Sequence, residues 1–132
     1  MPLISAWSIL FCCALFMFLT AQVVRARRAS GVALGDGGDK TLLRRIRGQA
    51  NAAEQMPITL LALAMAELIG GTSILLFLAA ALFLGGRLAH GICFGLLDHS
   101  PRLRFWGMLA SLIGSLSIMV IFGLCLLAAT FT

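Results

Sequence analysis

The sequence predicts an all-α integral membrane protein, built as a bundle of four transmembrane helices. Hydrophobic residues make up 61% of the 132 residues, against roughly 45–50% in soluble domains, and the mean hydropathy is +1.03. The apolar residues gather in runs near the roughly 20 residues that a helix needs to cross a bilayer. We expect one transmembrane domain, residues 1–132, with helices over about 3–28, 41–69, 72–97 and 103–130.

The basic residues predict the topology. The net charge is +5, and seven of the ten Lys and Arg residues lie between Arg25 and Arg47. Arg102 and Arg104 lie between the last two apolar runs, and only Arg87 lies inside a run. The positive-inside rule then places the 25–47 and 98–104 segments in the cytoplasm and both termini outside. This distribution points to a membrane lipid partner and not to nucleic acid.

The four cysteines all lie within the apolar runs. They are Cys12, Cys13, Cys93 and Cys125. Buried cysteine behaves as a small hydrophobic residue, so we expect packed thiols without disulfides and without a metal site.

Polar residues enter the second apolar run along one narrow helix face. Arg44, Arg47, Asn51 and Glu54 are spaced i, i+3, i+7 and i+10, which places them in one stripe at about 100° per residue. Each such group costs roughly 2.5–3.5 kcal/mol at the centre of a membrane helix, so it usually faces a protein interior or a wet cavity. We therefore interpret the stripe as one wall of a binding site for a small anionic molecule.

The third run carries a second polar face, formed by Arg87, His90 and Phe94 at i, i+3 and i+7. At 1.5 Å per residue, Arg87 and Glu54 lie at similar heights, roughly 15 and 10 Å from the cytoplasmic helix ends, whereas Glu67 lies near the outer end. We predict that Arg87 pairs with Glu54 and that Glu67 holds polar groups at the outer surface. A purely structural Arg–Glu pair is the alternative.

Local signals complete the outline of the bundle. Asp39 or Thr41 can cap the second helix, and Pro57 removes a backbone hydrogen bond and should bend it. Small residues at spacing four, from Gly107 to Ser115, let helix backbones approach closely.

The segment Arg47–Pro57 resembles the helix-2 signature of the MAPEG family, the membrane-associated proteins of eicosanoid and glutathione metabolism. That signature reads Arg-Ala-x-x-Asn-x-x-Glu-Tyr-x-Pro. Gln22–Ala29 resembles the end of helix 1 in the leukotriene synthase branch, and Arg87–His90 resembles the helix-3 motif of the prostaglandin synthase branch. The resemblance covers nearly the whole chain and is to the compact bacterial members of inner membranes.

The resemblance implies a homotrimer that binds glutathione, as co-substrate, between neighbouring subunits near the cytoplasmic side. The family's thiol-activating arginine stands at the start of helix 4, where this chain offers Arg104, which we favour, or Arg102. The candidate glutathione-binding residues are Arg27, Arg28, Arg44, Arg47, Asn51, Glu54, Arg87, His90 and Phe94.

The chemistry of these side chains agrees with that implication. Arginine binds carboxylates through paired donors, Glu54 can bind an amine, and Asn51 can donate and accept. A thiol attacks only as thiolate, with a pKa near ~8.5 when free, and a nearby guanidinium favours the anion. The expected function is a glutathione-dependent transferase or peroxidase acting on lipophilic electrophiles, with no metal.

Two departures from the family pattern keep other functions open. Gln55 and Phe94 stand where relatives have tyrosine, and the chain contains no tyrosine. One alternative is therefore a non-catalytic membrane protein that keeps the fold for binding or structure. A small multidrug-type transporter is another, but residues 3–24 lack the acidic residue that such exporters carry in their first helix.

Overall fold

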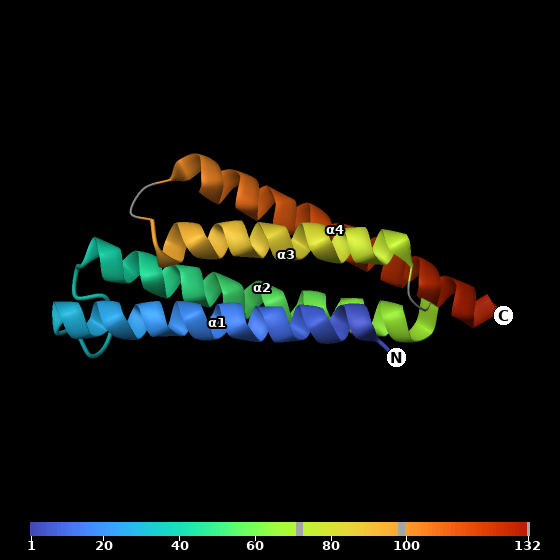
Figure 1. Ribbon diagram of the computed structural model, residues 1–132, viewed down its shortest axis with the longest axis horizontal. Helices are drawn as coiled ribbons and strands as arrows, with labels where there is room; N and C mark the ends of the chain where they lie inside the picture. The colour runs from blue at the N-terminus through green and yellow to red at the C-terminus, as the bar shows by residue number, and fades with distance from the viewer. Residues whose placement is uncertain (71–72, 98–99, 132) are drawn as a thin grey trace.

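The computed structural model describes residues 1–70, 73–97 and 100–131, and the elements in these ranges are helices. The helices are α1 (Leu3–Ser30), α2 (Lys40–Gly70), α3 (Ile74–Gly95) and α4 (Pro101–Phe131). They run along the long axis of the molecule, with both termini at the same end (Figure 1). All four are long and apolar enough to cross a membrane. The predicted all-α, four-helix membrane fold is confirmed.

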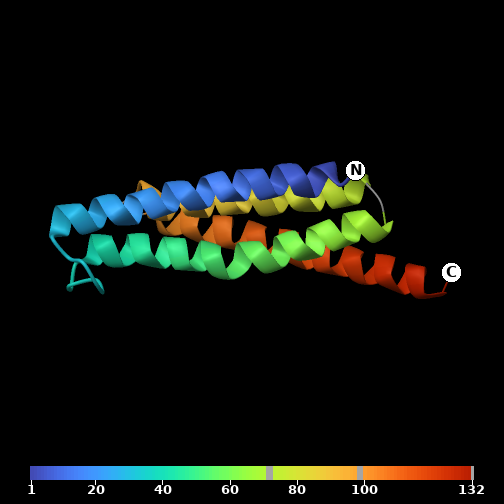
Figure 2. The ribbon, with the colours of Figure 1, turned by 90° about the horizontal axis from the view of Figure 1, so that it is seen from below.

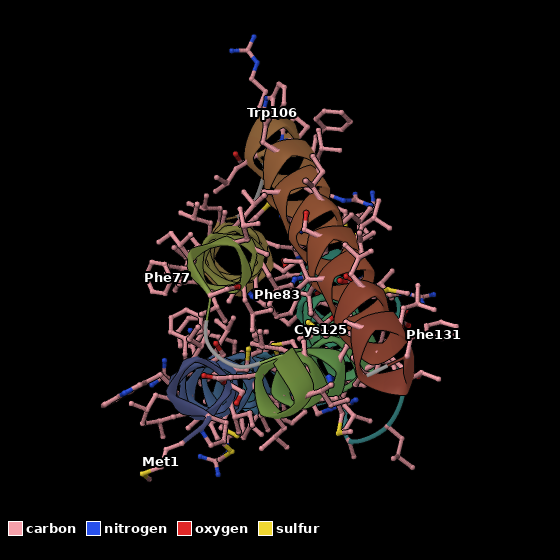
Figure 3. The ribbon with its side chains drawn as sticks, turned by 90° about the vertical axis from the view of Figure 1, so that its right-hand side faces the viewer. Met1, Phe77, Phe83, Trp106, Cys125 and Phe131 are labelled. Atoms are coloured by element: carbon pink, nitrogen blue, oxygen red, sulfur yellow. The ribbon has the colours of Figure 1, made fainter. Side chains whose placement is uncertain are left out.

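α3 and α4 cross in direct backbone contact, because glycines stand where they meet. A Cβ atom added to Gly86 would lie 2.3 Å from the backbone nitrogen of Ser111, and one added to Gly114 would lie 2.5 Å from that of Phe83. Seen end-on, Phe83 points into the bundle, whereas Phe77 and Trp106 point outward (Figure 3). The small residues of the fourth helix are packing residues, as predicted.

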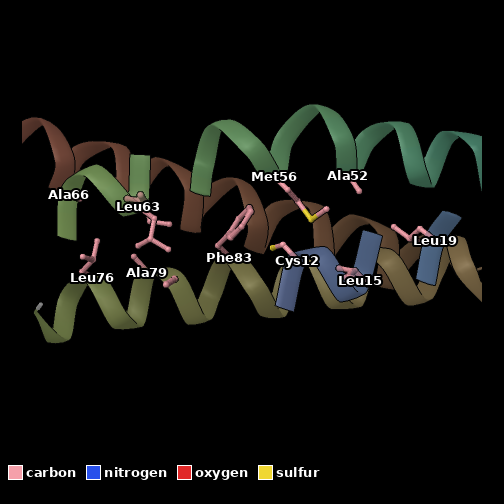
Figure 4. Close-up of a cluster of buried hydrophobic side chains, with 12 residues drawn as sticks. Cys12, Leu15, Leu19, Ala52, Met56, Leu63, Ala66, Leu76, Ala79 and Phe83 are labelled. Carbon is pink, nitrogen blue, oxygen red and sulfur yellow. The ribbon is translucent and has the colours of Figure 1, made fainter. Parts of the chain in front are cut away.

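The apolar core lies between α1, α2 and α3, with Ile118 of α4 closing it. Figure 4 shows its side chains in a row along the bundle. Its residues are Cys12, Leu15, Leu19, Ala52, Met56, Leu63, Ala66, Leu76, Ala79, Ala80, Phe83 and Ile118. All four cysteines are free thiols; Cys12 and Cys93 are buried, Cys125 is partly buried, and Cys13 is exposed on the outer face of α1.

α2 begins and bends where its sequence signals stand. The Asp39 carboxylate accepts hydrogen bonds from the backbone nitrogens of Thr41, at 2.8 Å, and Leu42, at 3.1 Å. Asp39 is therefore the residue that caps this helix. Pro57 lies within the helix, and the ribbon bends near its middle (Figure 2). This bend is the expected effect of a missing backbone donor.

Glu67, near the end of α2, caps the beginning of α1. Its carboxylate accepts from the backbone nitrogen of Ile4 at 3.0 Å, and from the backbone nitrogen and hydroxyl of Ser5, each at 2.8 Å. Glu67 is only 4% exposed, and Pro2, the residue before α1, provides no side-chain cap. The first N–H groups of a helix have no acceptor within the helix, and the Glu67 carboxylate supplies that acceptor for α1. The structural role predicted for Glu67 is therefore confirmed.

Removing this cap should destabilise the protein without changing the contacts at the opposite end of the bundle. We expect Glu67→Ala to lower the free energy of unfolding by about 1–3 kcal/mol, because buried donors lose a charged acceptor. Glu67→Gln keeps one acceptor oxygen, so its free energy of unfolding should lie between those of Glu67→Ala and the wild type. Thermal unfolding in detergent measures this, with Glu54→Gln, at an exposed carboxylate, as control. Equal melting temperatures for Glu67→Ala and the wild type would contradict the capping role.

Candidate functional site

A cavity of about 400 Å³ opens between α2, α3 and the first turns of α4. This volume is within the range of small-molecule sites, roughly 300–1,000 Å³. Its lining is Leu43, Arg44, Arg47, Ala50, Asn51, Glu54, His90, Phe94, Arg104 and Met108. A smaller recess of about 180 Å³ shares Arg44, Phe94 and Arg104 with it. Seven of the residues predicted from the sequence therefore line one cavity.

The α2 wall is the predicted stripe, and its first turns are tied to the end of α3. Arg44 donates to the carbonyl oxygens of Leu97, at 2.9 Å, and Cys93, at 3.5 Å. Arg45 donates to the carbonyl of Phe94. The last carbonyls of a helix lack partners within it, and basic side chains satisfy them well. These two arginines therefore hold the beginning of α2 and the end of α3 together.

The α3 wall consists of two neighbouring rings, and a guanidinium group of α4 lies beside them. The rings of His90 and Phe94 lie 4.6 Å apart, centre to centre, and the Arg104 guanidinium carbon lies 5.5 Å from the centre of the Phe94 ring. That distance fits a cation–π contact. Gly48 leaves room for this ring, since a Cβ there would lie 2.4 Å from Cβ of Phe94. The ring face of Phe94 therefore contacts the guanidinium group of Arg104.

Arg87 lies behind this wall and does not line the cavity. It is 2% exposed and donates from Nη1 to Oδ1 of Asn51 at 3.1 Å and from Nη2 to the Ser111 hydroxyl at 2.5 Å. No ion pair with Glu54 is found within the described ranges, so that predicted pairing is wrong. Similar height along the two helices was not sufficient to make Arg87 and Glu54 a pair. The guanidinium of Arg87 reaches Asn51 and α4, while Glu54 stays exposed one turn further along α2.

Three other candidates lie away from the cavity of the single chain. Arg27 donates to three carbonyls of the loop after α1, those of Val32, Ala33 and Gly35, at 3.4, 3.2 and 2.9 Å. Arg28 is exposed at the end of α1, and Arg102 is exposed on α4. Of the two arginines at the start of α4, only Arg104 lines the cavity.

Sequence reasoning missed Gly48 and three lining residues, Leu43, Ala50 and Met108, and it assigned Ser111 only to packing. Met108 lines the cavity but gave no signal in an apolar run. Gly48 looked like an ordinary residue of the motif, and its role depends on the approach of Phe94. Ser111 fitted a small-residue pattern, yet its hydroxyl also accepts from Arg87.

The cavity is chemically suited to an anion that also carries a cationic group. Arg44, Arg47 and Arg104 bring three guanidinium groups to its lining, and Glu54 brings one carboxylate. Guanidinium groups bind carboxylates with paired, charge-assisted hydrogen bonds. A ligand with more than one negative group and a single amine would satisfy this set.

Comparison with known proteins agrees with the sequence pattern. The model of the MAPEG family matches residues 4–127. The chain is 33% identical over 88 residues, 67% of each chain, to the inner membrane protein YecN of Escherichia coli K12. The same identity and coverage are found with YecN of E. coli O6:H1 strain CFT073.

The contact between Gly48 and Phe94 gives a prediction about stability. Gly48→Ala should lower the melting temperature, because overpacking of a tight contact costs about 1–3 kcal/mol. Gly85→Ala is the matched control, since nothing lies within 4 Å of a Cβ added there. Thermal unfolding of both variants in the same detergent measures the difference. A Gly48→Ala protein as stable as Gly85→Ala would show that the ring is not held as described.

Proposed function

The chain belongs to the MAPEG family, and from this premise we propose that it is an inner-membrane glutathione-dependent transferase or peroxidase acting on lipophilic electrophiles. The single observation that carries the proposal is that the Arg47, Asn51 and Glu54 wall of α2 and Arg104 of α4 line one cavity. The name of the E. coli relative supports the inner membrane as location.

The balance of charge in the cavity favours glutathione among small thiols. Three guanidinium groups and one carboxylate leave the lining with two positive charges. Glutathione as thiolate has two carboxylates, one ammonium group and the sulfur, and therefore carries two negative charges. The ammonium group would bind Glu54, and the carboxylates would bind Arg44 and Arg47. A simple thiol without carboxylates would leave these arginines unpaired.

Arg104 is the proposed activator of the thiol. Arg104 lies in the first turn of α4. Its backbone N–H donates to the carbonyl of Ser100, the residue before the helix, at 3.0 Å. Both the guanidinium and the positive end of the helix dipole favour an anion there. The thiol would lose its proton to water at the mouth of the cavity. The thiolate would then attack an electrophilic carbon, forming a C–S bond as the leaving group departs with its electron pair.

The proposal includes a homotrimer whose subunits share the site. Arg27 and Arg28 lie on α1, which contributes no side chain to the cavity of its own chain. A neighbouring subunit could bring them to the site. The proposed orientation has the loop of residues 31–39 in the cytoplasm and both termini outside, since most arginines lie at that end and the termini lie at the other (Figure 1).

A non-catalytic binding protein is the second candidate. The observation that favours it is Phe94, whose ring stacks with His90 in the cavity but has no hydroxyl to offer a ligand. Such a protein would bind glutathione without turning over electrophiles. Assays of binding and turnover on the same preparation separate the two candidates.

Glutathione binding tests the α2 wall directly. Arg47→Ala and Glu54→Ala should each weaken binding at least tenfold, because each leaves a charged group of the ligand unpaired. Titration calorimetry in detergent measures the dissociation constants. Arg25→Ala, at an exposed residue near the end of α1, is the control. Absence of wild-type binding at millimolar glutathione would end the proposal.

Turnover distinguishes Arg104 from Arg102. With an aryl halide as electrophile, Arg104→Ala should lower kcat at pH 7, and Arg102→Ala should not. The thiol pKa should rise in Arg104→Ala toward or above the free value of about 8.5, because the neighbouring cation is lost. The rise in rate with pH should therefore begin at higher pH in this variant. Conjugation that survives both substitutions would exclude a role for either arginine.

A further inference from the structure

Arg87 is a buried cation with a role still to be assigned. It is the largest of the fully buried side chains. Within the described part of the chain its partners are the neutral groups of Asn51, Ser111 and Met108, the last through sulfur at 3.6 Å, and its Nε atom has none. A charge at membrane depth is costly, so its retention requires an explanation that packing does not give.

The hydrogen bond to Asn51 determines how that amide is turned. A guanidinium group has donors and no acceptor. The Asn51 atom at 3.1 Å from Nη1 of Arg87 must therefore be its oxygen, whichever way the amide would turn by itself. The amide is planar, so its NH₂ group points away from Arg87. Because Asn51 also lines the cavity, the NH₂ group is the part left for a ligand.

α4 holds the guanidinium of Arg87 in the position from which it contacts Asn51. Nη2 of Arg87 donates to the Ser111 hydroxyl at 2.5 Å, and that hydroxyl donates to the Met108 carbonyl at 2.9 Å. Ser111 is fully buried and lies against Gly86, the residue before Arg87. Arg87 is thus fixed between α2 and α4 and cannot turn toward the cavity without breaking these contacts.

We propose that Arg87 is a positioning residue that fixes Asn51 as a hydrogen-bond donor, so that the cavity accepts only an oxygen acceptor of its ligand at that point. Glu54, one turn further along α2, is then the only carboxylate among the described residues of the lining and receives the ammonium group. The ligand is oriented because exchanging its carboxyl and amine ends would place N–H against N–H at Asn51. As far as it names the ligand, this inference rests on the proposed function.

The substitution Asn51→Asp separates orientation from stability. A carboxylate would form an ion pair with Arg87, so the melting temperature should stay at or above that of the wild type. The second carboxylate oxygen would face the cavity as an acceptor, so glutathione should bind at least tenfold more weakly. Asn51→Ala is the control and should lower both. A clear loss of stability in Asn51→Asp would overturn the contact with Arg87, whether or not glutathione binds.

Analogues of glutathione test the selectivity that Arg87 imposes. Two are needed, each with one carboxylate replaced by an aminomethyl group, which at neutral pH has donors and no acceptor. Wild-type protein should discriminate at least tenfold against the analogue whose changed group faces Asn51. In Arg87→Met the amide of Asn51 can turn, so the discrimination against this analogue should become smaller. The discrimination against the other analogue should be the same as in the wild type. KM for glutathione should rise with little change in kcat, because Arg87 does not reach the sulfur.

The outcomes distinguish this inference from the proposed function. Unchanged discrimination against both analogues in a folded Arg87→Met protein would overturn the positioning role and leave glutathione as ligand. Failure of wild-type protein to bind glutathione would overturn the proposed function. The stability of Asn51→Asp would then still decide whether Arg87 orients Asn51.

Discussion

The structure depends on one buried polar cluster, the guanidinium of Arg87 with Asn51 and Ser111. It joins α3 to α2 and α4 at one depth. In hydrocarbon an unsatisfied polar group costs several kcal/mol, so these helices cannot separate or rotate there without exposing donors and acceptors. Apolar contacts alone would allow them to slide along one another. The cavity lies against this cluster through Asn51, which lines it.

A second set of polar contacts closes the end of the bundle that is opposite the termini. Arg44 and Arg45 bind the last carbonyls of α3, and Arg104, in the first turn of α4, lies against Phe94. Residues that read in the sequence as topology anchors therefore also cap a helix and line a cavity. The opposite end is held by Glu67 on the first N–H groups of α1. Each end of the bundle thus has its own means of satisfying backbone groups.

The sequence was sufficient for the helices and for the faces that line the cavity, because a polar residue in an apolar run reveals its helix face by its spacing. Arg47, Asn51 and Glu54 were found in this way. The partner of Arg87 was not, because height along two helices does not determine where a long side chain turns. The choice of Arg104 over Arg102, the room that Gly48 leaves for Phe94, and the turn of Arg27 onto its own loop all depend on packing between segments distant in sequence.

The positive charge of the site does not change with pH. Arginine stays charged throughout the pH range of a cell, and the described cationic residues on the cavity lining are all arginines. A site built on lysine or histidine could lose its attraction for anions as its surroundings became more alkaline. Here the attraction stays constant, so a change in pH would alter the charge of the ligand and not the charge of the arginines that bind it.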